Sequence, residues 1–108
     1  MKKVVAYIRP HSLEPVKTSL ANLGGSGLSV GECRGHGRSP ERQTIPNVIP
    51  LSLRSRVEIV LPDELVEPAI QAVISQARTG DSGDGMIFVY PIEDSLRIRT
   101  LEKGEEAL

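Results

Sequence analysis

An α+β fold made of two successive βαβ units is predicted for this chain of 108 residues. The prediction rests on an internal repeat. The segments 10–15 and 62–68 each follow a strand pattern, contain proline, and precede a helical pattern, a glycine-containing turn and a second strand pattern. Two βαβ units with right-handed connections form a four-stranded antiparallel sheet with both helices on one face, which is the ferredoxin-like fold. We therefore expect a single domain over residues 1–108, with one bare sheet face that other copies of the chain would cover.

The first repeat has clear element boundaries. Residues 3–8 are rich in valine and isoleucine, which indicates a buried central strand. Ser12 is expected to cap the helix that follows, whose leucines and valine recur at helical spacing until the glycines at 24–25 stop it. Residues 27–34 alternate between small or polar and apolar types, which predicts a half-exposed strand.

The second repeat begins after a long irregular segment. Residues 39–53 contain three prolines and no sustained period, so we expect a long loop. Loops of this length inside a compact domain are usually functional or disordered, and we expect this one to contact a partner; the alternative is a linker. A strand is predicted over 56–61 and a helix from near Leu65 to Arg78, with a further strand after the glycine-rich turn. A last strand is predicted over 96–100.

Composition and charge argue against several classes of function. The formal net charge of −1 argues against a protein that covers nucleic acid. An RNA-binding module of this topology would use strand aromatics, and the chain has Tyr7, Phe88 and Tyr90, but it has no matching motif and no basic face. Cys33, the only cysteine, is expected to be buried and reduced in a cytoplasmic protein. His11 and His36 do not share metal-ligand spacing, so neither a zinc site nor a catalytic site is expected. The apolar run at 4–8 is too short for a signal peptide or membrane span.

The glycine-rich turn at 79–86 is the candidate functional element. It has three glycines in six residues, which allows successive backbone N–H groups to converge on a small anion such as phosphate. The alternative is a turn that ends the preceding helix and binds nothing. Arg97 and Arg99, on one face of the last expected strand, favour the phosphate interpretation.

With this pattern established, the chain resembles the PII nitrogen-regulatory signal-transduction family nearly end to end. The resemblance is carried by Met1-Lys2-Lys3, Ile8-Arg9-Pro10, Gly35-His36-Gly37-Arg38, Val57-Glu58-Ile59-Val60, Ala77-Arg78-Thr79-Gly80, Gly83-Asp84-Gly85, Ile87-Phe88-Val89 and Arg97-Ile98-Arg99-Thr100. It implies a homotrimer of ferredoxin-like subunits that binds adenine nucleotides in the clefts between neighbours. It also implies a long loop, here 39–53, that docks onto transporters or enzymes of nitrogen or carbon metabolism, so that any membrane association is indirect.

The family's nucleotide cleft can be carried over residue by residue. It maps onto Ser29, Gly35, Gly37, Arg38, Val60, Thr79, Gly83, Asp84, Gly85, Met86, Arg97 and Arg99. The implied ligand is ATP or ADP, with AMP as a further candidate and magnesium left open. Asp84 is expected to brace the turn instead of facing phosphate, because like charges repel.

Three departures from the family pattern qualify this assignment. Met86 replaces the lysine that normally follows the Gly-Asp-Gly turn, which removes a charged hydrogen bond to phosphate. Ser39 replaces the glutamine used to capture 2-oxoglutarate, and the shortened loop has no tyrosine, which argues against uridylylation. We expect a regulator without catalytic residues; the alternatives are a degenerate member that binds no nucleotide and a slow ATP-hydrolysing member of the same fold.

Overall fold

The computed structural model describes residues 1–24, 27–38 and 46–108. The strands are β1 (Lys2–Ile8), β2 (Leu28–Gly35), β3 (Ser52–Leu61) and β4 (Met86–Pro91), and the helices are α1 (Leu13–Ala21) and α2 (Val66–Ala77). Short 3-10 turns cover Pro10–Ser12, Asp63–Leu65 and Gly104–Ala107. No helix within these ranges has the length and apolar character needed to cross a membrane.

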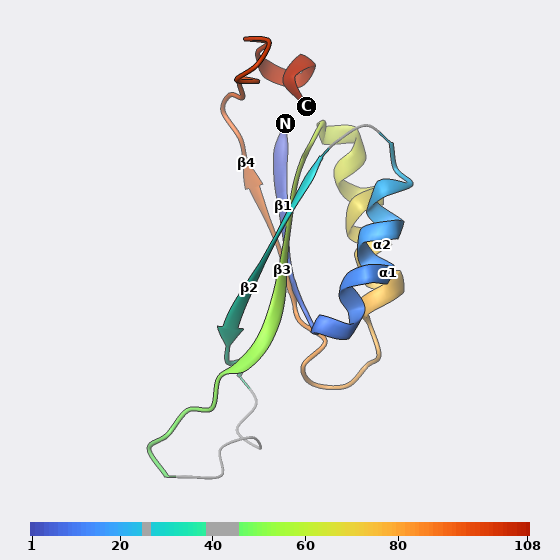
Figure 1. Ribbon diagram of the computed structural model, residues 1–108. Coiled ribbons are helices and arrows are strands. Elements are labelled where there is room, and N and C mark those ends of the chain that lie inside the picture. The colour runs from blue at the N-terminus through green and yellow to red at the C-terminus, as the bar shows by residue number, and fades with distance from the viewer. Residues whose placement is uncertain (25–26, 39–45) are drawn as a thin grey trace.

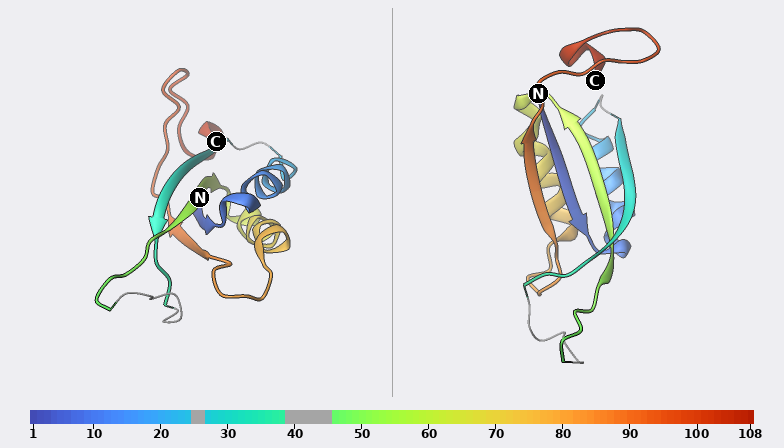
Figure 2. Two further views of the ribbon diagram at one scale, coloured as in Figure 1. Left: turned by 60° about the horizontal axis from the view of Figure 1, so that its bottom comes forward. Right: turned by 90° about the vertical axis from the view of Figure 1, so that its left-hand side faces the viewer.

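The strands form a sheet in the order β2-β3-β1-β4, in which every neighbouring pair is antiparallel. Both helices lie on one face of this sheet, and no helix of the described residues covers the other face (Figures 1 and 2). The predicted ferredoxin-like arrangement of four antiparallel strands and two helices is therefore confirmed.

The core lies between the sheet and the helices because the strands alternate with a period of two. The side chains buried on this face belong to β1 and β3 and meet those of α1 and α2: Val4, Ala6, Ile8, Val57, Ile59 and Leu61 against Val16, Leu20, Ala69, Val73 and Ala77. We call the opposite side the open face; it carries Lys3, Tyr7, Arg54, Arg56, Glu58, Phe88 and Tyr90. The Tyr7 and Phe88 rings meet edge to face there, 6.1 Å between centroids.

The prediction of a strand over residues 96–100 is wrong. Leu96 makes an isolated bridge to Lys103, and the residues between them form a turn closed by a hydrogen bond of 2.8 Å from the Leu101 amide to the Arg97 carbonyl. The alternation of apolar residues does not mark a buried face here, since Ile98 is 91% exposed. The segment pairs with itself because it leaves the sheet after β4 ends at Pro91 (Figure 1).

Three smaller expectations also need correction. Ser12 precedes α1 but makes no side-chain cap, because a 3-10 turn already places it in helical conformation. β3 begins at Ser52, so the loop predicted over 39–53 ends earlier than expected; its residues 39–45 lie outside the described residues. Cys33 is half-exposed, not buried, because its side chain lies on the open face opposite Arg54.

Candidate functional site

The turn between α2 and β4 is held by the carboxylate of Asp84. Its Oδ2 accepts hydrogen bonds of 2.8 Å from the backbone N–H groups of Thr79 and Gly80, and its Oδ1 accepts one of 2.5 Å from the Thr79 hydroxyl. The prediction that Asp84 braces the turn is therefore confirmed. The helix α2 ends at Ala77 because Arg78 is extended. The N–H groups of Thr79 and Gly80 then donate to Asp84 instead of to carbonyl groups of the helix.

Gly85 fixes the turn against β1. Its φ is +112°, and a Cβ at this position would collide with the carbonyl oxygen of Tyr7. Only glycine permits both this conformation and this close approach of two backbones. The turn is thereby placed at the end of the sheet where β1 finishes.

A cleft of about 1100 Å³ joins this turn to the end of β2. Eight of the predicted cofactor-binding positions lie in or directly behind it. Gly35, Gly37, Arg38, Gly83, Asp84, Gly85 and Met86 line the cleft, and Thr79 supports it through Asp84. The structure thus brings together two sequence segments that are about 50 residues apart.

The cleft is strongly cationic. Besides Arg38 it is lined by Arg34, Arg54 and Arg56, together with His36 and two carboxylates, Asp81 and Asp84. Arg56 lies 3.2 Å from Glu58, measured from Nε to Oε1. An arrangement of guanidinium groups around flexible backbone N–H donors is suited to phosphate or another anion.

The sequence reasoning did not place Arg34, Arg54 and Arg56 in this cleft. A signal for the last two was present, because residues 54, 56 and 58 alternate with the buried residues of β3 and must share the open face. Their position in the cleft depends on the register, in which Arg54 lies opposite Cys33 and Arg56 opposite Gly31.

Arg9 was also missed as a site residue. Its Nη1 lies 2.7 Å from Asp84 Oδ1, and its Nη2 donates a hydrogen bond of 2.9 Å to the Ser82 carbonyl. The two partners are 75 and 73 residues away in the sequence, so no local pattern reveals the contact.

Four of the predicted site residues do not lie at this cleft. Ser29 and Val60 lie further along the open face, near the other end of the sheet, and the segment holding Arg97 and Arg99 follows that end. Ser95, two residues before Arg97, contacts Met1, whereas Gly85 contacts Tyr7 at the far end of β1. Figure 1 shows the glycine turn and the C-terminal segment at opposite ends of the sheet. Within one chain Arg97 and Arg99 therefore do not meet the turn, and their assignment to a cleft between copies stays a prediction.

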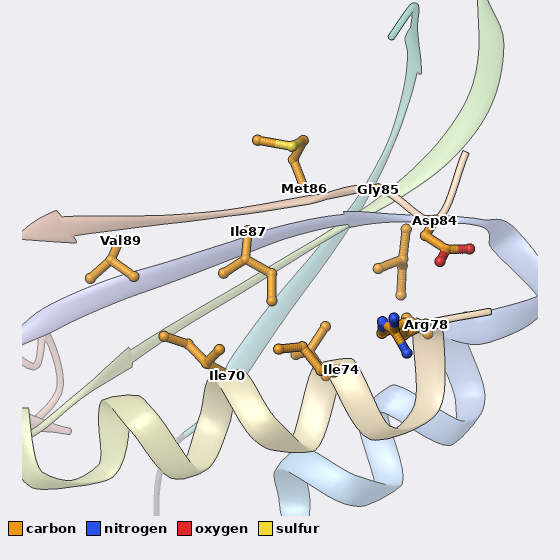
Figure 3. Close-up of a pocket in the computed structure, with 11 residues that line it drawn as sticks. Ile70, Ile74, Arg78, Asp84, Gly85, Met86, Ile87 and Val89 are labelled. Atoms are coloured by element: carbon orange, nitrogen blue, oxygen red, sulfur yellow. The ribbon is translucent and has the colours of Figure 1, made fainter. Parts of the chain in front are cut away.

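Met86 lies on the cleft side of β4 and is 59% exposed. Figure 3 shows its side chain pointing away from α2, whereas Ile70, Ile74 and Ile87 face one another in an apolar groove between α2 and β4. That groove, of about 570 Å³, is separate from the cationic cleft and shares only residues 84–86 with it.

The hydrogen bonds from Thr79, Gly80 and Arg9 hold the pKa of Asp84 well below its ordinary value of 3.8. The contribution of these hydrogen bonds to the stability of the fold is therefore fully present above pH 3.8 and is lost as the pH falls through the lower pKa of the folded state.

We expect Asp84→Asn to reduce the free energy of unfolding more at about pH 7 than at about pH 2.5, measured by urea denaturation. Asp81→Asn is the matched control, since the Asp81 carboxylate has no hydrogen-bond partner among the described residues. Equal losses for Asp84→Asn at both pH values would contradict the prediction.

Comparisons with known proteins place the whole chain with one group of relatives. A family model described as "Nitrogen regulatory protein P-II" matches residues 1–102. Proteins named Nitrogen regulatory protein P-II from Haemophilus influenzae, Rhodobacter capsulatus and Nostoc punctiforme are 41%, 45% and 44% identical to the chain. Each alignment covers the whole of both proteins.

Proposed function

Because the chain belongs to the nitrogen regulatory protein P-II family, we propose that it is a signal-transduction regulator that senses an adenine nucleotide. The nucleotide binds in a cleft between neighbouring copies and changes how the loop 39–53 contacts a partner. The partner is a transporter or metabolic enzyme of nitrogen or carbon metabolism, met in the cytoplasm.

The observation that carries this proposal is the division of the candidate site. The glycine turn and Arg38 lie at one end of the sheet, whereas Arg97 and Arg99 belong to a segment beyond the other end. A strand of six or seven residues separates the two ends by roughly 20 Å, which is too far for one phosphate group. Residues from both ends can therefore contact the same phosphate group only if they come from different copies of the chain.

The sheet edges support such an assembly. β2 and β4 are the edge strands of the described sheet, and both carry an exposed valine on the helix side, Val30 and Val89. A contact between β2 of one copy and β4 of the next is heterologous, and such contacts form a closed ring when the rotation allows it. A homotrimer would also cover Phe88 and Tyr90, which are exposed on the open face.

The ligand chemistry follows from the cleft. Backbone N–H groups of the turn and the guanidinium groups of Arg38, Arg54 and Arg56 favour a phosphate chain. Without a lysine at position 86 the cleft has one cation fewer for a terminal phosphate, which favours ADP or AMP over ATP.

The cleft also explains how a ligand can affect the loop. Gly37 and Arg38 precede the loop, Pro50 lies near its end and Ser52 begins β3, and all four line the cleft. A ligand that prefers one arrangement of these residues shifts the loop by that preference. The described end of the loop exposes Val48, Ile49 and Leu51, so we expect the partner surface to be apolar.

Isothermal titration with ATP, ADP and AMP, each with and without Mg²⁺ and 2-oxoglutarate, tests the proposal. We expect binding of at least one nucleotide, and no heat with any of them would overturn nucleotide sensing. Light scattering should give the mass of three chains, and a monomer at the same concentration would overturn the cleft between copies.

Mixing two variants tests the division of the site directly. Arg38→Ala and Arg97→Ala/Arg99→Ala each alter one half of the cleft, so each should bind weakly alone. In randomly mixed trimers about a quarter of the clefts contain two unaltered halves and should recover full affinity. Failure to recover binding in mixed trimers, when both variants form trimers, would place the two halves in one chain.

A further inference from the structure

The cationic cleft contains a carboxylate, Asp84, within the same turn whose backbone N–H groups are proposed to bind phosphate. A carboxylate in this position normally repels phosphate or requires a divalent cation between the two. The hydrogen bonds around Asp84 suggest a different solution.

All the acceptor capacity of Asp84 is used within the protein. An ionised carboxylate has about four lone-pair sites. The donors are the two backbone N–H groups of Thr79 and Gly80, the Thr79 hydroxyl, and Nη1 of Arg9, at distances from 2.5 to 2.8 Å. Arg9 supplies both the fourth donor and the positive charge that balances the carboxylate.

Arg9 also orients the backbone of the turn. Its Nη2 holds the Ser82 carbonyl at 2.9 Å, and the N–H of the same peptide belongs to Gly83. A trans peptide is planar, so the Gly83 N–H points opposite to the Ser82 carbonyl and away from Arg9. Ser82 and Gly83 line the cleft whereas Arg9 does not, which directs the Gly83 N–H into the cleft.

We propose that Arg9 is the positioning residue that allows this cleft to bind the phosphates of a nucleotide beside Asp84 without a bridging divalent cation. This inference rests on the proposed nucleotide-binding function and specifies the form of the ligand: the metal-free nucleotide. Mg²⁺ requires oxygen ligands with free lone pairs, and Asp84 offers none while Arg9 is in place. The described residues also contain no group of three or more His, Cys, Asp or Glu side chains able to hold a metal ion.

Titration of the full-length protein with ADP, in EDTA and in excess MgCl₂, tests the inference. The wild type should bind ADP at least as tightly in EDTA as in MgCl₂. Arg9→Gln should weaken binding in EDTA by about tenfold or more, and MgCl₂ should restore part of the loss, since loss of the Arg9 donor leaves one lone pair of Asp84 Oδ1 available to the cation. Arg9→Lys keeps the charge and should retain most of the affinity in EDTA.

Lys17→Gln is the matched control, because it removes an exposed cation from an ion pair on α1 with Glu14, far from the turn in sequence and not lining the cleft. Its affinity should equal that of the wild type in both buffers. Binding of ADP by the wild type only in MgCl₂, or an equal loss for Arg9→Gln in both buffers, would overturn the inference.

A second measurement separates this inference from the proposed function. Without nucleotide, Mn²⁺ should leave the NMR signals of the Thr79 and Gly80 amides sharp in the wild type and broaden them in Arg9→Gln. Broadening in the wild type would overturn the role of Arg9, whether or not any nucleotide binds. Absence of ADP binding in both buffers, with the expected Mn²⁺ result, would instead overturn nucleotide sensing and leave Arg9 as the residue that closes Asp84 to cations. If Arg9→Gln does not fold, the wild-type comparisons still decide.

Discussion

Replacement of Gly85 by alanine is expected to lower the free energy of unfolding by roughly 2–5 kcal/mol. Two effects add. The backbone φ of +112° is one that residues with a Cβ rarely adopt, and the added methyl group would collide with the Tyr7 carbonyl oxygen. Because β1 is a central strand, relief of the collision must disturb the pairing of Tyr7 with Met86. Urea denaturation at a fixed protein concentration measures the loss, since assembly contributes to the stability of an oligomer.

Gly80→Ala separates the two effects. Gly80 also has a positive φ, +93°, but a Cβ there has no atom within 4 Å. The free energy of unfolding of this variant should therefore fall only by the cost of the positive φ, about 1–3 kcal/mol. If Gly80→Ala and Gly85→Ala lose equal stability, the close approach of the turn to β1 does not contribute.

Met86→Lys is expected to tighten nucleotide binding by roughly ten- to a hundredfold, because a charge-assisted hydrogen bond to phosphate contributes about 1.5–3 kcal/mol. Met86 directly follows the glycine turn, lines the cleft and is exposed, so a lysine there can reach the ligand without disturbing the core. The gain should be larger for ATP than for AMP, since the added charge serves the terminal phosphates. Titration calorimetry at low salt measures both affinities.

Met86→Gln controls for the loss of the methionine side chain, because glutamine has a similar length and no charge. It should bind nucleotide about as the wild type does. The prediction fails if the lysine and glutamine variants have the same affinity, and the turn then does not contact phosphate.

Much of the fold could be predicted because its signals are local. The apolar spacing of residues 13–20 and 66–77 reflects a helical period, and the alternation in β3 reflects a half-buried strand. The hydrogen bonds by which Asp84 braces the turn could also be predicted, since the donors Thr79 and Gly80 are only five and four residues away. In each case the interacting groups lie close together in the sequence.

The segment 96–100 shows where local reasoning fails. Its apolar and charged residues alternate as in a strand, but a strand requires a partner with free backbone groups. The segment lies beyond the end of β4 and has no such partner in the described chain, so it folds back on itself around the bridge between Leu96 and Lys103. The same change of position moves Arg97 and Arg99 away from the turn.

The sequence by itself determined the βαβ repeat, the amphipathic helices and the glycine turn with its carboxylate brace, because periodicity and short-range hydrogen bonds act between near neighbours. Only the tertiary structure decided which charges share the cleft. Strand register placed Arg54 and Arg56 beside β2, where they line the cleft, and the packing of β1 beside β4 brought Arg9 to Asp84 across 75 residues. Contacts of this kind form only when strands that are distant in the sequence pair with one another, so no spacing along the chain predicts them.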